Sequence, residues 1–162
     1  MSRRCRAILL SLLCGFLVSA AFAQGPPKAY GTAITADNAK KVAAAASAEA
    51  RKNGWYMAIA VVDPSGTLVY YEKMDNTQTG SANVAIEKAR TAALFKRPSK
   101  VFQDALITGG ASLRVLALPG AIPIEGGIPL MADDKIVGAI GVSGDSSDHD
   151  ALCAQAGVDA LK

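Results

Sequence analysis

The stretch from Gly120 to Gly144 constrains the fold of this chain more than any other, because it has the pattern of a β-hairpin. One apolar arm runs from Ile128 to Ala132, Asp133 and Asp134 form the turn, and the return arm runs from Lys135 to Val142. After its first residue the return arm contains only Val, Ile, Ala and Gly. We therefore expect other elements to cover both of its faces.

A pair of glycines, Gly126 and Gly127, comes directly before Ile128 and Pro129 at the start of the first arm. Proline has no N–H to donate to a ladder, so this arm is predicted to be an edge strand. Adjacent glycines permit positive φ and leave room for a close approach. Two explanations stay open: a sharp bend into the edge strand next to another segment of backbone, or the approach of a flat ligand.

The N-terminus has the pattern of a secretory signal peptide over residues 1–23. Arg3, Arg4 and Arg6 form the positive region, an apolar run follows, and Ala21-Phe22-Ala23 matches the A-x-A cleavage pattern. The apolar run is too short for an ordinary membrane-spanning helix, and no later segment has about 18 uninterrupted apolar residues. We therefore expect an exported, soluble protein, periplasmic or secreted, with no membrane span.

The signal peptide also explains the basic character of the sequence. The whole chain carries 17 Lys and Arg against 14 Asp and Glu, and removal of the three signal-peptide arginines leaves 14 against 14. A nucleic acid partner therefore loses its main support. We expect a loose leader over residues 24–34 and a single domain over residues 35–162. Cys153 is the one mature thiol, either a small buried core residue or the site of an intermolecular disulfide.

Apolar periodicity predicts the other elements. Helices are expected over residues 36–52, 81–95 and 99–107 and at the C-terminus as far as residue 161, with strands over residues 55–62 and 67–74. The inward faces of the first two helices consist mostly of alanine, so they can lie close to a sheet. The order of elements predicts an α+β fold, an antiparallel sheet flanked by helices on its faces.

Few residues suggest catalysis or metal binding. The sequence contains no Gly-x-Ser-x-Gly elbow, no phosphate-binding loop and no dinucleotide fingerprint. His149 and Cys153 have i,i+4 spacing and could offer two ligands to a metal, but two ligands do not close a site. A surface position for His149 and a core position for Cys153 are simpler explanations, and no residue is assigned a catalytic role.

Several short segments, spread in order along nearly the whole mature chain, form a pattern of their own. They are Ala58–Gly66, Lys73–Asp75, Ala85, Lys88-Ala89, Thr91–Phe95, Gly126–Pro129, Gly138–Gly144 and Cys153–Gly157. This pattern resembles the haem-binding and haem-degrading family that includes the glycolate-operon G proteins, extracellular haem-binding sensor proteins and the C-terminal domain of PduO-type proteins. The resemblance implies a profilin-like domain, assembly into homo-oligomers, and haem as a cofactor that some members degrade.

The resemblance leaves the iron ligand unknown. Some members ligate haem iron through a histidine of the N-terminal helix, and the helix predicted over residues 36–52 has none. Asn76-Thr77 also stands where the family usually has Gly-Ala. The remaining possibilities are a tyrosine or methionine, with Tyr70, Tyr71 and Met74 available, a threonine, His149, or no strong iron ligand at all.

We place the ligand beside the glycine pair. A flat apolar ligand requires a surface without bulky side chains, an apolar wall, and a cation for its acid groups. The residues expected to supply these are, in that order, Gly126 and Gly127, then Phe95, Ile128 and Pro129, then Arg90 or Lys96. Lys88 belongs to the same predicted group of cations, and an ordinary solvated face of the helix would explain all three side chains equally well. The arrangement requires the helix over residues 81–95 to run beside the hairpin.

The sequence therefore favours an exported haem-binding protein that acts in haem capture, buffering or sensing. Haem breakdown rests on the resemblance alone. Two other functions stay open: a metal-free binding module for a small metabolite, and a self-assembling interaction subunit. The edge strand and the alanine-faced helices would leave apolar surface uncovered, which favours a homo-oligomer in each case.

Export gives the first testable prediction. N-terminal sequencing of the protein from the periplasm or medium of its native host should begin at Gln24, because signal peptidase cleaves after Ala21-Phe22-Ala23. Recovery of the full-length chain from the cytoplasm would contradict this prediction.

Overall fold

The structure is a computed structural model that describes residues 28–162. The signal peptide expected over residues 1–23 and the first four residues of the leader lie outside the described residues. The elements are, in order, α1 (Ala36–Asn53), β1 (Ala58–Val62), β2 (Leu68–Lys73), α2 (Ser81–Leu94), α3 (Lys100–Thr108), the 3-10 helix η1 (Gly110–Ala117), β3 (Gly127–Ala132), β4 (Lys135–Ser143) and α4 (Ser147–Leu161).

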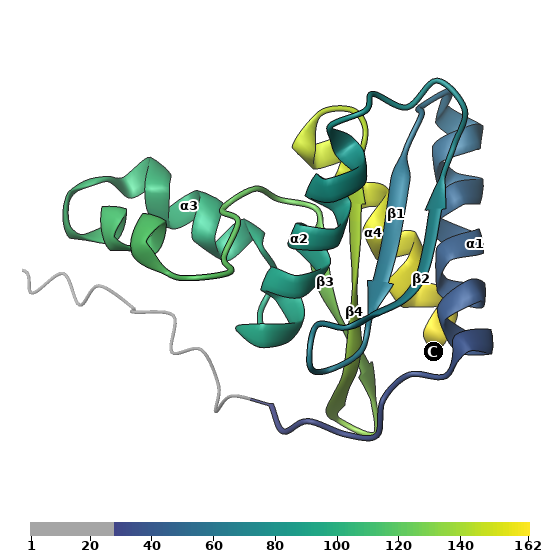
Figure 1. Ribbon diagram of the computed structural model, residues 1–162, viewed down its shortest axis with the longest axis horizontal. Helices are drawn as coiled ribbons and strands as arrows, with labels where there is room; N and C mark the ends of the chain where they lie inside the picture. The colour runs from purple at the N-terminus through teal and green to yellow at the C-terminus, as the bar shows by residue number, and fades with distance from the viewer. Residues whose placement is uncertain (1–27) are drawn as a thin grey trace, which may run out of the picture.

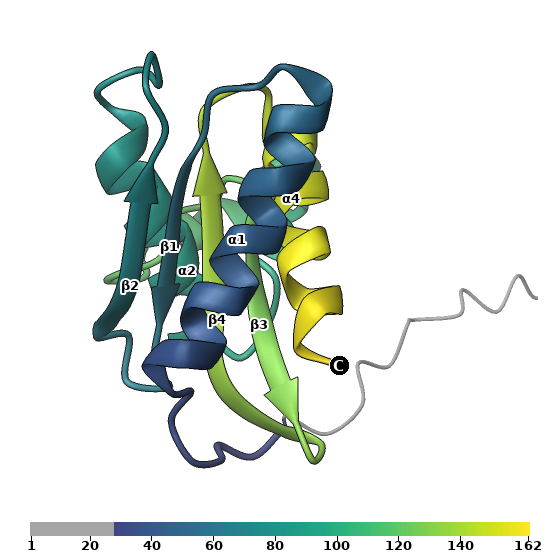
Figure 2. The ribbon, with the colours of Figure 1, turned by 90° about the vertical axis from the view of Figure 1, so that its right-hand side faces the viewer.

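The strands form one antiparallel sheet in the order β2-β1-β4-β3. Helices α1 and α4 lie side by side on one face of this sheet, and α2 lies on the other (Figures 1 and 2). Each face has its own apolar core, a larger one under α1 and α4 and a smaller, alanine-rich one under α2. The predicted α+β architecture with helices on both faces is confirmed.

The β3–β4 hairpin forms as the sequence predicts. Asp133 and Asp134 have φ values of 46° and 62°, which suits the tight turns of two-residue hairpins, and aspartate tolerates this region better than most residues. Strand β4 is buried from Ile136 to Ser143, between β1 and β3. Strand β3, with Pro129 inside it, is an edge strand as predicted.

The small residues of α1 permit its close contact with the sheet and with α4. Thr35 caps the helix by accepting a hydrogen bond from the N–H of Asn38, and Gly54 ends it with a φ of 74°. The alanines at positions 39, 43, 46 and 50 are completely buried. The predicted inward face is thus correct, but the expectation that alanine faces stay uncovered is wrong, because the domain covers them itself.

The glycine pair before β3 is explained by the backbone of α2. A Cβ atom on Gly127 would lie 2.1 Å from the carbonyl oxygen of Lys88, and one on Gly141 would lie 2.1 Å from that of Ala85. Gly126 has a φ of 121°, and a Cβ there would lie 2.8 Å from the carbonyl oxygen of Val142. Of the two explanations left open above, the close approach of another backbone segment is the one observed.

Two segments differ from the sequence predictions. The described part of the leader is not loose: Gly31 and Ile34 donate hydrogen bonds to the carbonyls of Ile136 and Val137 in β4, and Ile34 is buried in the core. The second segment is the arm formed by α3 and η1, which projects from the domain (Figure 1). The sequence predicted α3 but not η1. No helix among residues 28–162 is long and apolar enough to cross a membrane.

Because α2 lies so close to β3, the addition of a single methyl group at Gly127 should lower the stability of the protein. Gly127→Ala should destabilise the protein by about 1–3 kcal/mol, because the added methyl group meets the backbone of α2 rather than a side chain that can move. Urea denaturation measures this loss. Gly80→Ala is the matched control, since a Cβ there meets nothing within 4 Å, and equal effects of the two substitutions would contradict the prediction.

Candidate functional site

A cleft of about 440 Å³ lies where the start of α3, the start of β3 and the first half of α4 meet. This volume is within the roughly 300–1,000 Å³ typical of small-molecule sites. Of the site residues predicted from sequence, Gly126, Gly127 and Ile128 line this cleft. Pro129 follows in β3 and is half-buried, but it is not one of the lining residues.

The cleft has a wall of apolar side chains. Pro98 contributes from the turn before α3, Ile128 from β3, and Ala151 and Leu152 from α4. Leu152 is 56% exposed, a high value for a leucine, so a ligand in the cleft would remove apolar surface from water. This wall suits the face of a flat apolar molecule.

The charged side chains of the cleft are mostly acidic. Lys100 is its one cation among the described residues, and its Nζ lies 3.0 Å from Asp104 Oδ1 and 3.3 Å from Glu125 Oε2. These two hydrogen bonds, that to Asp104 foremost, raise the pKa of Lys100. Asp148 lines the cleft as well, and a hydrogen bond from Ser146 lowers the pKa of its carboxyl. An acidic group of a ligand would thus meet one ammonium that already has partners.

The structure does not bring the predicted cations or Phe95 to this cleft. Arg90 donates to the Gly66 carbonyl at 3.1 Å and to Glu87 at 2.7 Å, beside the β1–β2 turn. Lys96 Nζ lies 4.1 Å from the centre of the Tyr30 ring. Phe95 packs edge-on against Phe102, with ring centres 5.3 Å apart. None of Arg90, Phe95 and Lys96 is among the residues that line the cleft.

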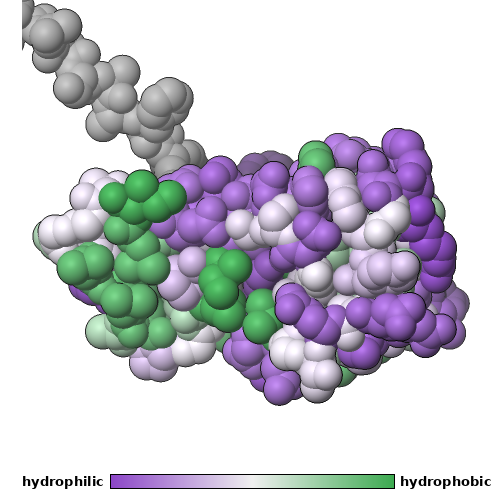
Figure 3. Space-filling view, turned by 90° about the horizontal axis from the view of Figure 1, so that it is seen from above, coloured by the Kyte–Doolittle hydropathy of each residue, from purple (hydrophilic) through white to green (hydrophobic). Residues whose placement is uncertain are grey.

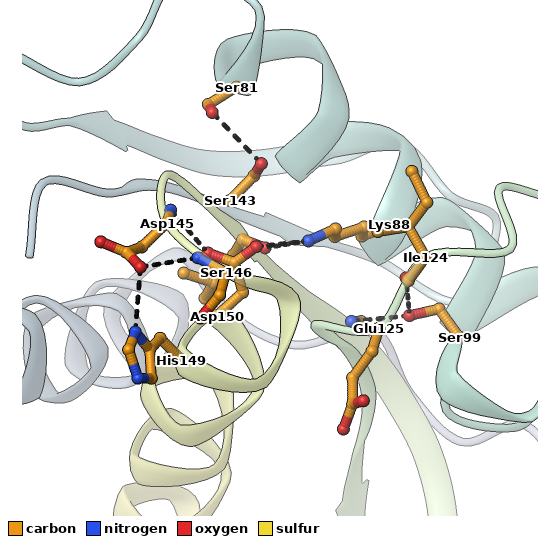
Figure 4. Close-up of polar contacts among 12 residues, drawn as sticks. Ser81, Lys88, Ser99, Ile124, Glu125, Ser143, Asp145, Ser146, His149 and Asp150 are labelled. Carbon is orange, nitrogen blue, oxygen red and sulfur yellow. Dashed lines mark hydrogen bonds and ion pairs between the residues drawn. The ribbon is translucent and has the colours of Figure 1, made fainter. Parts of the chain in front are cut away.

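Lys88, the other predicted surface cation, is instead buried in an ion pair with Asp150 of α4. Their side chains are 1% and 3% exposed, and Lys88 Nζ lies 2.6 Å from Asp150 Oδ2 (Figure 4). Nζ also donates to the Val142 carbonyl at 3.1 Å, and Asp150 Oδ1 accepts from the N–H of Asp145 at 3.3 Å. The expectation of a solvated Lys88 is therefore wrong.

Burial and pairing act against each other in this ion pair. Burial lowers the pKa of the Lys88 ammonium and raises that of the Asp150 carboxyl, while the attraction between the two charges opposes both changes. A Cβ on Gly126 would lie 2.9 Å from Lys88 Nζ and 3.0 Å from Asp150 Cβ. The pair therefore lies directly behind the start of β3 and joins α2 and α4 there.

The sequence contains a signal for this pair that the prediction of a solvated Lys88 overlooked. Lys88 falls on the same helical face as Ala85 and Ala92, and Asp150 falls on the same face as Cys153 and Ala154. A charged residue on an inward face is almost never buried without a partner. One positive and one negative residue of this kind, on two different helices, predict a buried ion pair.

The candidate iron ligands are placed away from the cleft or have other partners. His149 stacks on Trp55 with ring centres 4.0 Å apart, and its Nδ1 lies 2.9 Å from Asp145 Oδ1. Cys153 is a free, buried thiol, and burial raises its pKa to about 12, so it stays protonated at neutral pH. Among residues 28–162 no group of three or more His, Cys, Asp or Glu is arranged to hold a metal ion.

Met74 lines a different cleft, of about 340 Å³, together with Tyr56, Arg51 and Lys73. Its sulfur accepts a hydrogen bond from the N–H of Met57 at 3.4 Å. Tyr71 has a buried hydroxyl without a hydrogen-bond partner among residues 28–162, and burial raises its pKa. None of the described residues that line the cleft at β3 is a His, Cys, Met or Tyr. The apolar wall therefore fits a porphyrin face, whereas the donor set does not fit haem iron.

A double-mutant cycle tests the coupling between Lys88 and Asp150. Lys88→Met should cost about 3–5 kcal/mol of stability in urea denaturation, because it leaves the Asp150 carboxylate buried without a cation. The double variant Lys88→Met/Asp150→Leu should recover most of this loss. Lys162→Met, which breaks the exposed pair with Asp159, is the control and should have little effect. Strictly additive losses in the cycle would contradict the coupling.

Comparison with known proteins agrees with the resemblance seen in the sequence. Residues 34–159 match the family described as "Haem degrading protein HbpS-like". Protein GlcG of Escherichia coli K12 is 40% identical over 105 residues, which are 65% of this chain and 77% of that protein. The crystal structure of HbpS has a TM-score of 0.75 at 31% identity, covering 86% of this chain and 98% of that chain. The crystal structure of a PduOC–haem complex has a TM-score of 0.72 at 25% identity, covering 80% and 95% respectively. The chain therefore belongs to the HbpS-like family of haem-degrading proteins.

Proposed function

We propose that this protein binds haem in the cleft at the start of β3 and acts, after export, in haem capture, buffering or sensing. The observation that carries the proposal is the family relationship, which spans residues 34–159 and includes a relative whose crystal structure is a haem complex. The export step rests on the signal-peptide pattern of residues 1–23.

The cleft supports this proposal through its shape and its apolar wall. Ile128 of β3 and Leu152 of α4 both line the cleft, so a flat ring lying against them would remove apolar surface from water. Lys100, at the rim, is the cation available for a propionate, in place of the predicted Arg90 or Lys96. Gly126 and Gly127 contribute backbone atoms to the wall of the cleft. The side of Gly127 that faces α2 is already occupied by the backbone of that helix.

The proposal is binding rather than breakdown. The ionisable residues of the cleft are Lys100, Glu125 and Asp148, and the first two already form an ion pair with each other. Such groups can orient and attract a ligand. Haem breakdown is an oxidation rather than a hydrolysis, and no residue of the cleft is assigned a part in it.

An absorption titration of the mature protein with haemin tests the proposal. Leu152→Asp should weaken binding roughly tenfold, because it removes the apolar contact of a leucine, which is worth about 1.5 kcal/mol. The variant also adds a second negative charge to the cleft, near that of Asp148. Ala48→Asp is the control, since it adds the same charge at an exposed position of α1. If both variants bind haemin as the unmodified protein does, the ligand does not occupy this cleft. A thermal shift with small carboxylic acids but none with haemin would favour the metal-free binding module.

Self-association is a second proposal, carried by a different observation. The arm of α3 and η1 exposes Ile107, Leu113, Leu116 and Leu118, with exposed fractions of 79%, 49%, 66% and 38%. Figure 3 shows apolar surface gathered at the end of the molecule that carries this arm. Exposed apolar surface of this kind marks interaction sites. We propose that the arm, rather than the alanine-faced helices, holds copies of this chain together.

Light scattering of the mature protein at micromolar concentration should therefore give the mass of a homo-oligomer. The variant Ile107→Lys/Leu116→Lys should shift that mass toward a single chain, because it places charges in the apolar contact. Leu68→Lys, at the exposed edge of β2, is the control and should leave the mass unchanged. A single-chain mass for the unmodified protein would refute this proposal.

A further inference from the structure

The cleft at the start of β3 has an apolar wall but no side chain that ligates iron strongly. Its described lining residues provide apolar contacts from Pro98, Ile128, Ala151 and Leu152. Its polar lining side chains are Lys100, Glu125, Asp148 and Gln155. Strong axial ligands of haem iron in proteins are His, Cys, Met and Tyr, and the described lining contains none of them.

The side chains that could ligate iron are committed to other contacts. His149 follows Asp148 in α4, but its ring stacks on Trp55, and Figure 4 places it on the opposite side of α4 from Glu125. Cys153 is buried as a neutral thiol in the core under α1 and α4. Met74 lines a cleft formed by residues 51, 56 and 72–75 instead. No other His, Cys, Met or Tyr of the described residues lines the cleft at β3.

Resting on the haem-binding function proposed above, we infer that this cleft recognises the tetrapyrrole ring and not its iron. The ligand class is therefore a porphyrin with acidic groups at one edge, with or without a metal. Recognition comes from the apolar wall on the ring faces and from Lys100 at the edge. The acidic group of the ligand competes there with Asp104 and Glu125 for the ammonium, so the contribution of Lys100 is sensitive to salt.

Titrations with haemin and with metal-free protoporphyrin test this inference on the same protein. The two dissociation constants should agree within about threefold, because the contacts that hold the ring do not involve the metal. Leu152→Asp should weaken both ligands by similar factors, and His149→Ala should change neither. Lys100→Met should weaken both modestly, and 0.5 M salt should reduce the difference between this variant and the unmodified protein.

The outcomes separate this inference from the function on which it rests. If haemin binds at least a hundredfold more tightly than metal-free protoporphyrin, an axial ligand dominates and the inference is wrong, while haem binding stands. Loss of the haemin Soret shift in His149→Ala or Met74→Leu would overturn the inference in the same way and would identify the ligand. If neither porphyrin binds, both the inference and the proposed function fail.

Discussion

The close contact between α2 and the sheet is the constraint on which the rest of this structure depends. Gly127 in β3 and Gly141 in β4 let the helix backbone lie against the strands without intervening side chains. Alanine on the facing side of α2 completes the contact, and the core on this face is correspondingly thin. Interiors pack at nearly crystalline density, so a contact this close tolerates no added methyl group.

The same contact determines where the Lys88–Asp150 pair lies. Because α2 approaches β3 and β4 so closely, the ammonium of Lys88 reaches past the end of β4 to a carboxylate on α4, on the other face of the sheet. The pair therefore connects both helical layers behind the start of β3. The hydroxyl of Ser99 adds a second link there, by accepting from the N–H of Gly127 and donating to the Ile124 carbonyl. The cleft thus has buried, hydrogen-bonded polar groups behind its apolar wall.

This arrangement gives the glycine pair a different role from the one that its sequence suggests. Glycines before an edge strand leave space, and the sequence does not say what fills it. Here the backbone of α2 fills it, and the cleft that Gly126, Gly127, Ile128 and Leu152 line lies beside it. The cation of the site also differs from the one that the sequence predicts. Arg90 and Lys96 contact Gly66 and Tyr30, and Lys100, in the next helix, is the cation that lines the cleft.

The sequence by itself determined the features that depend on neighbouring residues: the β3–β4 hairpin with its Asp133-Asp134 turn, the edge position of β3, the buried character of β4 and the helices with their alanine faces. Propensity, periodicity and turn chemistry act over a few residues, so they can be read from the chain directly. The tertiary structure alone decided the pairing of β1 with β4, the partner of Lys88, the packing of residues 28–34 on β4 and the residues that share the cleft. Each of these joins segments far apart in the chain, and the choice among such partners depends on how well whole surfaces pack together, which no local pattern records.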